Sequence, residues 1–432
     1  MSVVFVLIAF VAMILLMLAG LPIAVVMAVV GIIGGVLAYG MPFLDSISPV
    51  VWGVQNDNLL TSIPLFVLLG EILLRAGIAD RMSLALSAWM GRLPGGLLHS
   101  NIATCALFAA TSGSSVATAA TVGTVALPSL QARGYAVAPS LGTLAAGGTL
   151  GILIPPSVNL IIYGSLTNTS IGQLFMGGIV PGLLLSGLFM LFIALTHCGA
   201  EKAAMREANV PLALKLRASV HLIAPVVIFG VVMGSIYTGL ATTTESAALG
   251  VMVALGFAAS ARALNWPTLR TCFIQTARVS GMILLIITSA FILNLTISLT
   301  GVAEDMSAWV NSLGLSATAF LLVLVVFYLV LGMFMDVLSM QVATIPITFP
   351  MAIALGIDPV WFGIFVVLMC ELGLITPPVG MNLFVVHGIR PDKGNMTDVI
   401  RGALPYAAIM MVFSLLLIAM PDIVTWLPGK AA

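Results

Sequence analysis

Long apolar runs, separated by short polar stretches, make up most of this chain. They cover about residues 3–19, 21–40, 59–76 and 173–196 in the first half, and about 220–237, 243–262, 278–299 and 400–427 in the second. A helix needs about 20 predominantly apolar residues to cross the hydrocarbon core of a bilayer. Each run approaches or exceeds that length, so the pattern predicts an all-α polytopic membrane protein.

Two further apolar runs, 138–165 and 360–388, are interrupted by a Pro-Pro pair. The interruptions read Gly151-Ile152-Leu153-Ile154-Pro155-Pro156 and Gly373-Leu374-Ile375-Thr376-Pro377-Pro378. Two successive prolines remove two amide donors and clash with the preceding turn, so neither run can be a continuous helix. Broken backbone at membrane depth is tolerated only where it is buried in protein or lines a cavity. Two such breaks, one in each half, predict the binding site of a secondary transporter.

Two other segments predict re-entrant helical hairpins, which enter and leave the membrane on one side. Residues 96–132 and 316–354 are each long enough for two short helices, with polar residues in the middle. The middle of the first segment is Thr111-Ser112-Gly113-Ser114-Ser115, and the middle of the second is Met335-Asp336-Val337-Leu338-Ser339. Small and polar residues suit the tip of a hairpin that turns inside the membrane.

The order of these segments repeats with a constant offset. Gly373 follows Gly151 by 222 positions (373 − 151), and Pro350 follows Pro128 by the same 222 (350 − 128). We therefore divide the chain into a first repeat, 1–196, a charged cytoplasmic linker, 197–218, and a second repeat, 219–432. Five full spans in each half give about ten transmembrane spans. Because five is odd, the second repeat is predicted to be inverted relative to the first.

Composition and charge support a membrane protein and indicate its orientation. The chain is 61% hydrophobic and 7% charged, and its formal net charge of zero gives no indication of nucleic-acid binding. If both termini are periplasmic, 14 of the 15 lysines and arginines lie on the cytoplasmic side, and only Lys430 lies outside. The positive-inside rule favours this arrangement. The four cysteines and four histidines form no metal-ligand or redox motif.

The hairpin tips and helix breaks carry the oxygen atoms that a hard cation such as Na⁺ prefers. Freed backbone carbonyls, hydroxyls and the negative ends of half-helices all favour a bound cation. We predict that each tip pairs with the break of its own half. The candidate Na⁺ ligands are Ser112, Gly113 and Ser114 with Gly151, Ile154, Pro155 and Ser157, and Asp336 with Thr376, Pro377 and Gly380. Close helix packing is the alternative explanation for the small residues.

Polar groups near the same positions are candidates for substrate contact, namely Ser114, Ser115, Asn159, Asp336 and Asn382. The half-helices that follow the breaks present free amides and partial positive charge, which suits an anion. Asn159 and Asn382 have an alternative role, which is to hydrogen-bond the freed backbone.

Three other acidic residues lie in predicted spans. Glu245 is a further functional candidate, with a helix-capping role as its alternative. Glu71 is expected to pair with Arg75 one turn later rather than to take part in transport. Glu371, directly before the second break, could orient that break.

The motifs resemble the large membrane subunit of TRAP (tripartite ATP-independent periplasmic) transporters, in the ion transporter superfamily. The resemblance rests on the twin Gly-x-x-x-Pro-Pro breaks, Ile63-Pro64-Leu65-Phe66 leading to Gly70-Glu71, the Ser112-Gly113-Ser114 tip and Thr244-Glu245-Ser246-Ala247-Ala248, and it runs from near residue 1 to near 427. One departure is Thr243, where the family is expected to have proline.

The resemblance implies the permease of a bacterial inner-membrane importer, driven by Na⁺, for organic carboxylates such as C4-dicarboxylates or sialic acids. It also implies elevator-type movement, a small four-span membrane subunit, a periplasmic substrate-binding protein, and Gly373 as a further member of the second Na⁺ site. A stand-alone cation-coupled anion symporter is the alternative. No nucleophile-base set or cofactor motif indicates an enzyme.

Overall fold

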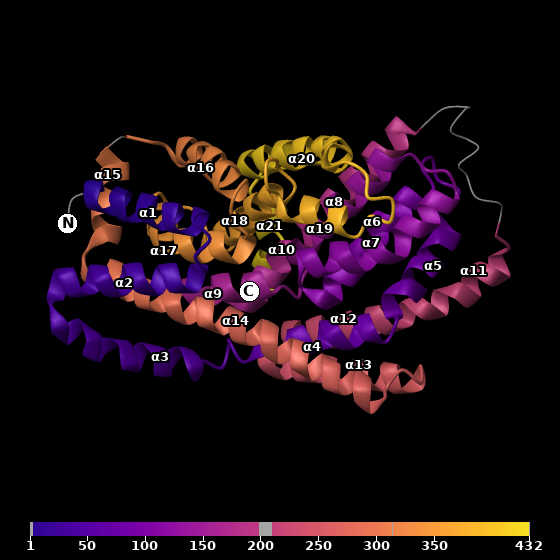
Figure 1. Cartoon of the computed structure of the whole chain (residues 1–432), viewed down its shortest axis with the longest axis horizontal. Helices are drawn as coiled ribbons and strands as arrows, with labels where there is room; N and C mark the ends of the chain where they lie inside the picture. The colour runs from indigo at the N-terminus through magenta and orange to yellow at the C-terminus, as the bar shows by residue number, and fades with distance from the viewer. Residues whose placement is uncertain (1–2, 198–209, 313, 432) are drawn as a thin grey trace.

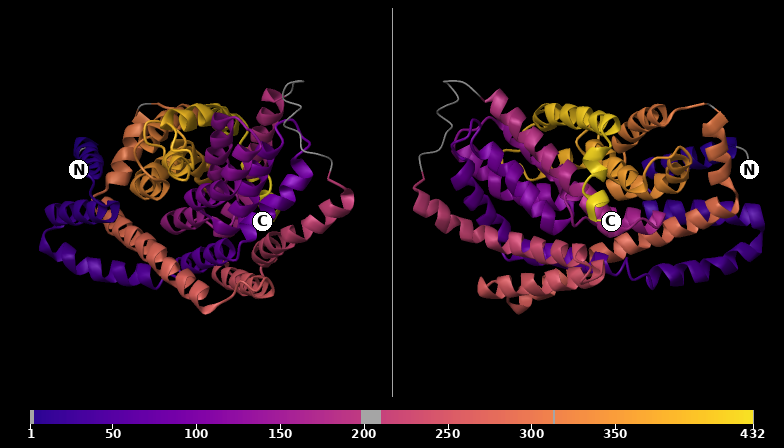
Figure 2. Two further views of the ribbon diagram at one scale, coloured as in Figure 1. Left: turned by 45° about the vertical axis from the view of Figure 1, so that its right-hand side comes forward. Right: turned by 180° about the vertical axis from the view of Figure 1, so that it is seen from behind.

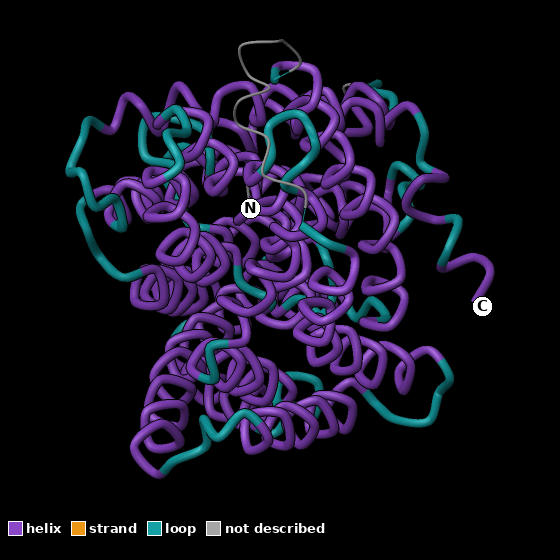
Figure 3. Tube along the Cα trace, turned by 90° about the vertical axis from the view of Figure 1, so that its right-hand side faces the viewer, coloured by secondary structure: helices purple, strands orange, loops and turns teal. Residues whose placement is uncertain are grey.

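The computed structural model describes residues 3–197, 210–312 and 314–431, and this part of the chain folds into helices and loops without a strand (Figure 3). Six of its helices are long and apolar enough to cross a membrane, or up to eight if each of two bent pairs is one span. Three further apolar helices, Ile23–Tyr39, Ala317–Gly332 and Pro359–Leu374, are shorter. The chain is therefore an integral, multi-pass helical membrane protein, while the count of ten spans stays a prediction.

One group of helices lies along the lower side and at the two ends of the molecule in Figure 1, and we call this group the outer layer. Its members are α1 (Val3–Leu18), α2 (Ile23–Tyr39), α3 (Ile47–Gln55), α4 (Ser62–Arg75), α5 (Ile78–Met90), α11 (Leu212–Ser219), α12 (Ile223–Tyr237), α13 (Thr243–Ser260), α14 (Trp266–Leu299) and α15 (Val302–Ser312). Within it α14 packs along α2, α3 and α4, and α13 packs between α4 and α12. Short 3-10 turns over Met41–Ser46 and Val220–Leu222 connect parts of this layer.

The remaining helices form a compact body beside that layer (Figure 1, Figure 2). They are α6 (Leu97–Ser112), α7 (Ser115–Ala132), α8 (Val137–Leu153), α9 (Val158–Thr167), α10 (Ile171–Thr196), α16 (Ala317–Gly332), α17 (Val337–Ala354), α18 (Pro359–Leu374), α19 (Met381–Gly388) and α20 (Met396–Ala419), followed by α21 (Asp422–Thr425) and α22 (Pro428–Ala431). The order of α6 to α10 recurs in α16 to α20: two helices joined by a tight turn, a helix broken at Pro-Pro, and a long helix.

Two elements of the outer layer differ from the sequence expectations. The span expected over 278–299 is the last part of α14, a 34-residue helix that begins at Trp266 behind its N-cap, Asn265. No element was expected over 41–58, yet the 3-10 turn and α3 lie there. The proline and aspartate residues of that segment made a loop the expected conformation. The short helix α3 forms there in contact with α14, from which it is far apart in the sequence. Of the predicted linker 197–218, residues 198–209 lie outside the described part of the chain.

Glu245 forms a capping box at the start of α13. Its carboxylate accepts hydrogen bonds of 2.8 Å from the Thr242 amide and from the Thr242 hydroxyl, and the Thr242 hydroxyl accepts one of 3.3 Å from the Glu245 amide. The same turn contacts the loop between α3 and α4, because the Thr244 hydroxyl donates to the Asn58 carbonyl at 2.7 Å. These bonds show the capping role; a role of Glu245 in transport stays a prediction.

We expect Thr242→Ala to lower thermal stability in detergent by about 1 kcal/mol, the usual effect of losing an N-cap hydroxyl. Thr242→Ser keeps the hydroxyl and should keep the wild-type melting temperature.

If Glu245 acts only through this cap, Glu245→Gln should transport at the wild-type rate, because the amide oxygen of the glutamine can still accept from Thr242. Loss of uptake in a stable Glu245→Gln protein would show instead that the charge of Glu245 is needed for transport.

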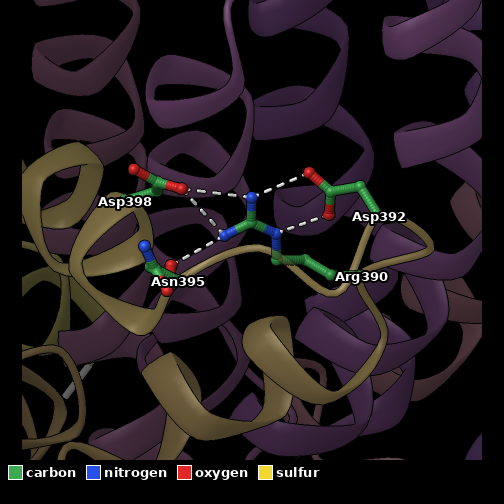
Figure 4. Close-up of polar contacts among 4 residues, drawn as sticks. All are labelled: Arg390, Asp392, Asn395 and Asp398. Carbon is green, nitrogen blue, oxygen red and sulfur yellow. Dashed lines mark hydrogen bonds and ion pairs between the residues drawn. The ribbon is translucent and has the colours of Figure 1, made fainter.

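Arg390 organises the loop between α19 and α20. Figure 4 shows its guanidinium between two carboxylates, with Nε 2.7 Å from Asp392 and Nη1 3.1 Å from Asp398, while Nη1 also donates to the Asn395 carbonyl at 2.8 Å. Arg390 is 6% exposed, and a side chain at Gly394 would collide with its guanidinium. The hydrogen bond from Arg390 holds the pKa of Asp392 below its usual range.

Arg390→Ala should destabilise the protein by about 1 kcal/mol, because the loop loses a buried guanidinium that donates to the Asn395 carbonyl and to two carboxylates. A depressed carboxyl pKa contributes stability above the unfolded value, about 4, and that stability is lost as the pH falls through the folded value. The difference in melting temperature between wild type and variant should therefore be full at pH 7 and shrink on acidification below about pH 4. Arg401→Ala, at an exposed position of α20, serves as the control; an equal loss there would contradict this account.

Candidate ion and substrate site

The tip of the first hairpin contacts the first helix break directly. The turn between α6 and α7 is made at Gly113, whose positive φ of 60° suits glycine. A methyl group at Gly113 would lie 2.9 Å from the Pro156 carbonyl oxygen, and one at Gly151 would lie 2.8 Å from the Ser114 carbonyl oxygen. Because these contacts join backbone to backbone, glycine is required at both positions for the hairpin and the break to meet.

Hydroxyl groups at this junction cap the helix ends. Ser114 Oγ accepts from the Ala117 amide at 3.3 Å, and Ser157 Oγ accepts from the Leu160 amide at 3.4 Å. Ser112 Oγ lies 3.0 Å from Thr118 Oγ1, which donates to the Ser114 carbonyl at 2.7 Å. The predicted residues at the first tip and the first break thus lie close together, whereas a role as Na⁺ ligands stays a prediction.

The second hairpin meets the second break in the same way. The Val379 amide donates to the Met333 carbonyl at 3.2 Å, which ties the break to the end of α16. A methyl group on Gly373 would lie 2.5 Å from the Gly332 Cα. Beside Gly380, whose φ is 39°, a methyl group would lie 2.9 Å from the Thr376 carbonyl oxygen and 3.0 Å from that of Leu374. Two carbonyl oxygens therefore face one point at this break.

Asp336 is the N-cap of α17, at the tip of the second hairpin. One carboxylate oxygen accepts from the Ser339 amide at 3.2 Å and the other accepts from the Ser339 hydroxyl. The side chain is neither fully buried nor exposed. Two oxygens held by one cap have lone pairs to spare for a ligand at the tip.

The oxygen set of both junctions suits Na⁺. A hard monovalent cation takes carbonyl, hydroxyl and carboxylate oxygens, all of which occur here. Within the described residues there is no group of three or more His, Cys, Asp or Glu side chains that could hold a metal ion. A cation at these junctions would therefore depend mainly on backbone and hydroxyl oxygens.

Comparison with known proteins shows the family of this chain. The family model described as "Tripartite ATP-independent periplasmic transporter, DctM component" matches residues 10–423. This chain is a TRAP transporter large permease. The C4-dicarboxylate TRAP transporter large permease protein DctM of Pseudomonas aeruginosa is 34% identical to it over 398 residues, covering 91% of this chain and 92% of the relative.

Other similar proteins show how far the likeness extends. The isethionate TRAP transporter permease protein DctMQ of Oleidesulfovibrio alaskensis is 32% identical over 420 residues, covering 96% of this chain and 65% of that protein. Among solved structures, the Alcanivorax borkumensis YdaH transporter has a TM-score of 0.60 at 16% identity, covering 94% of this chain and 98% of that one. That last likeness shows a shared fold only.

Ser115 of the permease connects its two halves through contacts that no local pattern in the sequence indicates. Its hydroxyl lies 2.9 Å from the Gly148 carbonyl oxygen of α8 and 3.0 Å from Oε2 of Glu371 on α18, and it accepts from the Asn382 amide of α19 at 2.9 Å. Ser115, Glu371 and Asn382 are each at most 1% exposed. Residues 115 and 382 were predicted as substrate contacts; here their polar atoms bond to one another, and substrate contact stays a prediction.

The remaining predicted residues lie in the wall of the first break. Asn159 is 5% exposed, and its Oδ1 has no hydrogen-bond partner. Ile154 and Pro155 pack against α10, where a methyl group on Gly178 would lie 2.6 Å from the Leu153 carbonyl oxygen and one on Gly182 would lie 2.7 Å from Ile154. The spacing of Gly178 and Gly182 is the small-residue pattern of close helix packing, a signal that could have placed α10 here from sequence.

Proposed function

We propose that this chain is the large permease subunit of a Na⁺-coupled, binding-protein-dependent importer of organic carboxylates. The observation that carries the proposal is the direct contact of each hairpin tip with the helix break of its own half. The first junction brings backbone carbonyl groups close to serine hydroxyls, and Asp336 adds a carboxylate at the tip of the second hairpin. Oxygens of these kinds are what transport of a cation with its cargo requires.

An anionic substrate fits the same region. The amide ends of α9 and α19 follow the two breaks and carry partial positive charge, which favours a carboxylate. Among the lysines and arginines of the described part of the chain Arg390 alone is buried, and it is paired with the carboxylates of Asp392 and Asp398. An organic anion would therefore depend on amide groups, hydroxyls and bound Na⁺ for its charge balance.

The class of cargo is broader than one compound. The two relatives described above carry C4-dicarboxylate and isethionate in their names at nearly equal identity to this chain. Overall identity thus does not distinguish a carboxylate cargo from a sulfonate. We favour a carboxylate, such as a C4-dicarboxylate or a sialic acid, delivered by a periplasmic binding protein.

The transport cycle that we propose is an elevator movement of the compact body against the outer layer. The body would comprise the hairpins and broken helices, α6 to α10 and α16 to α20, and the outer layer would stay in place with a small four-span partner subunit. We place the assembly in the bacterial inner membrane, with ten spans in two inverted repeats and both termini in the periplasm. The distribution of basic residues supports this orientation.

Reconstitution tests the proposal. The chain is purified with the small membrane subunit that we propose as its partner, placed in proteoliposomes, and supplied with the proposed binding protein and a panel of labelled carboxylates. We expect uptake only with an inward Na⁺ gradient and with the binding protein present. Uptake by the chain alone, without a binding protein, would support a stand-alone symporter instead. Absence of any Na⁺-dependent uptake across the panel would count against both.

A further inference from the structure

Four helices from both halves of the chain meet at one serine hydroxyl. Ser115 lies in the first turn of α7, Gly148 lies on α8, Glu371 lies one turn before the end of α18, and Asn382 lies at the start of α19. The hydroxyl thus joins the first hairpin and the first broken helix to both arms of the second broken helix. The sequence separations, 256 residues to Glu371 and 267 to Asn382, make these bonds entirely tertiary.

The single hydrogen of the hydroxyl has no spare capacity. It lies between two acceptors within 3.0 Å of Ser115 Oγ, the Gly148 carbonyl and Glu371 Oε2, while a lone pair of the oxygen accepts from the Asn382 amide. The Asn382 amide nitrogen also donates to the Ala145 carbonyl at 3.3 Å, which fixes the orientation of that side chain. Replacing any one member leaves buried polar groups of the others unpaired, and such groups are costly in the interior.

Close packing around the hydroxyl removes the room for an alternative arrangement. A methyl group on Gly148 would lie 2.8 Å from the Ala119 side chain and 3.0 Å from the Asn382 amide nitrogen. None of the ion pairs of the described residues includes Glu371. The hydrogen bond to Ser115 is thus the polar contact that the structure gives the Glu371 side chain, whose other carboxylate oxygen, Oε1, has no partner.

We propose that Ser115, Glu371 and Asn382 form a positioning network that couples the two halves of the site, so that cation binding at the first junction favours binding at the second. The inference rests on the proposed Na⁺ coupling. Its physical basis is the position of each member: Ser115 follows the first tip directly, while Glu371 and Asn382 flank the second break on either side. Movement at one junction must therefore be accompanied by movement at the other or break these bonds.

The test compares the Na⁺ dependence of wild type with that of Ser115→Ala in the complete, reconstituted transporter. We expect the Hill coefficient for Na⁺ to fall toward 1 and the half-saturating Na⁺ concentration to rise by about five- to 150-fold, the usual range of coupling between sites. Glu371→Gln keeps a side chain that can bond to Ser115 and should retain cooperativity, whereas Glu371→Leu should lose it. Ser414→Ala is the matched control, because Ser414 is fully buried but bonds within its own helix, to the Met411 carbonyl.

Na⁺-dependent thermal stabilisation in detergent gives a second measurement that does not require transport. If wild type shows cooperative Na⁺ dependence and Ser115→Ala keeps the same Hill coefficient, the coupling network is refuted while the proposed function stands. An equal loss of cooperativity in Ser414→Ala would also refute it, since any buried serine would then have the same effect. If wild type shows neither Na⁺-dependent uptake nor Na⁺-dependent stabilisation, the proposed function itself fails.

Discussion

A single added methyl group at Gly151 or at Gly373 is expected to reduce uptake by at least about tenfold. The new carbon would lie 2.8 Å from the Ser114 carbonyl oxygen in the first case and 2.5 Å from the Gly332 Cα in the second. Both neighbours are backbone atoms, which cannot move aside as a flexible side chain can. Overpacking of this kind costs about 1–3 kcal/mol, and 1.4 kcal/mol corresponds to about a tenfold change in an equilibrium constant. Each hairpin tip would be displaced from its break.

Matched controls separate this effect from the general effect of alanine in a helix. A methyl group on Gly187 in α10 or on Gly281 in α14 would meet no atom within 4 Å. Gly187→Ala and Gly281→Ala should therefore transport normally and be as stable as wild type or more so, since alanine favours a helix over glycine by about 1 kcal/mol. Uptake in proteoliposomes and the melting temperature in detergent are the measurements. Wild-type uptake by both Gly151→Ala and Gly373→Ala would mean that the junctions are not the transport site.

Replacing Asp336 by asparagine is expected to raise the half-saturating Na⁺ concentration at least about tenfold without destabilising the protein. Asparagine is as good an N-cap as aspartate, since its amide oxygen can accept from the Ser339 amide while its NH2 group donates to the Ser339 hydroxyl. What the variant removes is the negative charge. A cation about 4 Å from a carboxylate at an effective dielectric constant of about 20 gains about 4 kcal/mol, less at a half-exposed position.

Asp358→Asn supplies the control for charge alone. Asp358 is also an N-cap, because it accepts from the Trp361 amide at 2.8 Å at the start of α18. It is exposed, and the full length of α18 separates it from the second break. Na⁺ titrations of uptake should show wild-type behaviour for Asp358→Asn. If Asp336→Asn also retains the wild-type Na⁺ response, Asp336 acts only as the N-cap of α17 and does not bind Na⁺.

The helix breaks, hairpin tips and family could be predicted from the chain because each follows from local chemistry. Two consecutive prolines end a helix wherever they occur, and both breaks lie where the Pro-Pro pairs predicted them. The Gly113 turn follows from a glycine between serines. The presence of α3 could not be predicted in this way. The hydrophobic pattern over 41–58 is too short and mixed to predict a helix, and only the packing of α3 against α14 decides the conformation of α3.

Sequence by itself determined that this chain is a helical membrane protein of the TRAP large-permease family, with two interrupted helices whose freed backbone must be buried. It could do so because hydrophobicity and proline act over a few residues. The meeting of Ser115 with Glu371 and Asn382, the contact of Gly332 with Gly373, and the pairing of Arg390 with two aspartates were decided by the tertiary structure. The first two contacts join segments far apart in the chain, and nothing in the local pattern distinguishes a serine that bridges two halves from one that merely caps a helix.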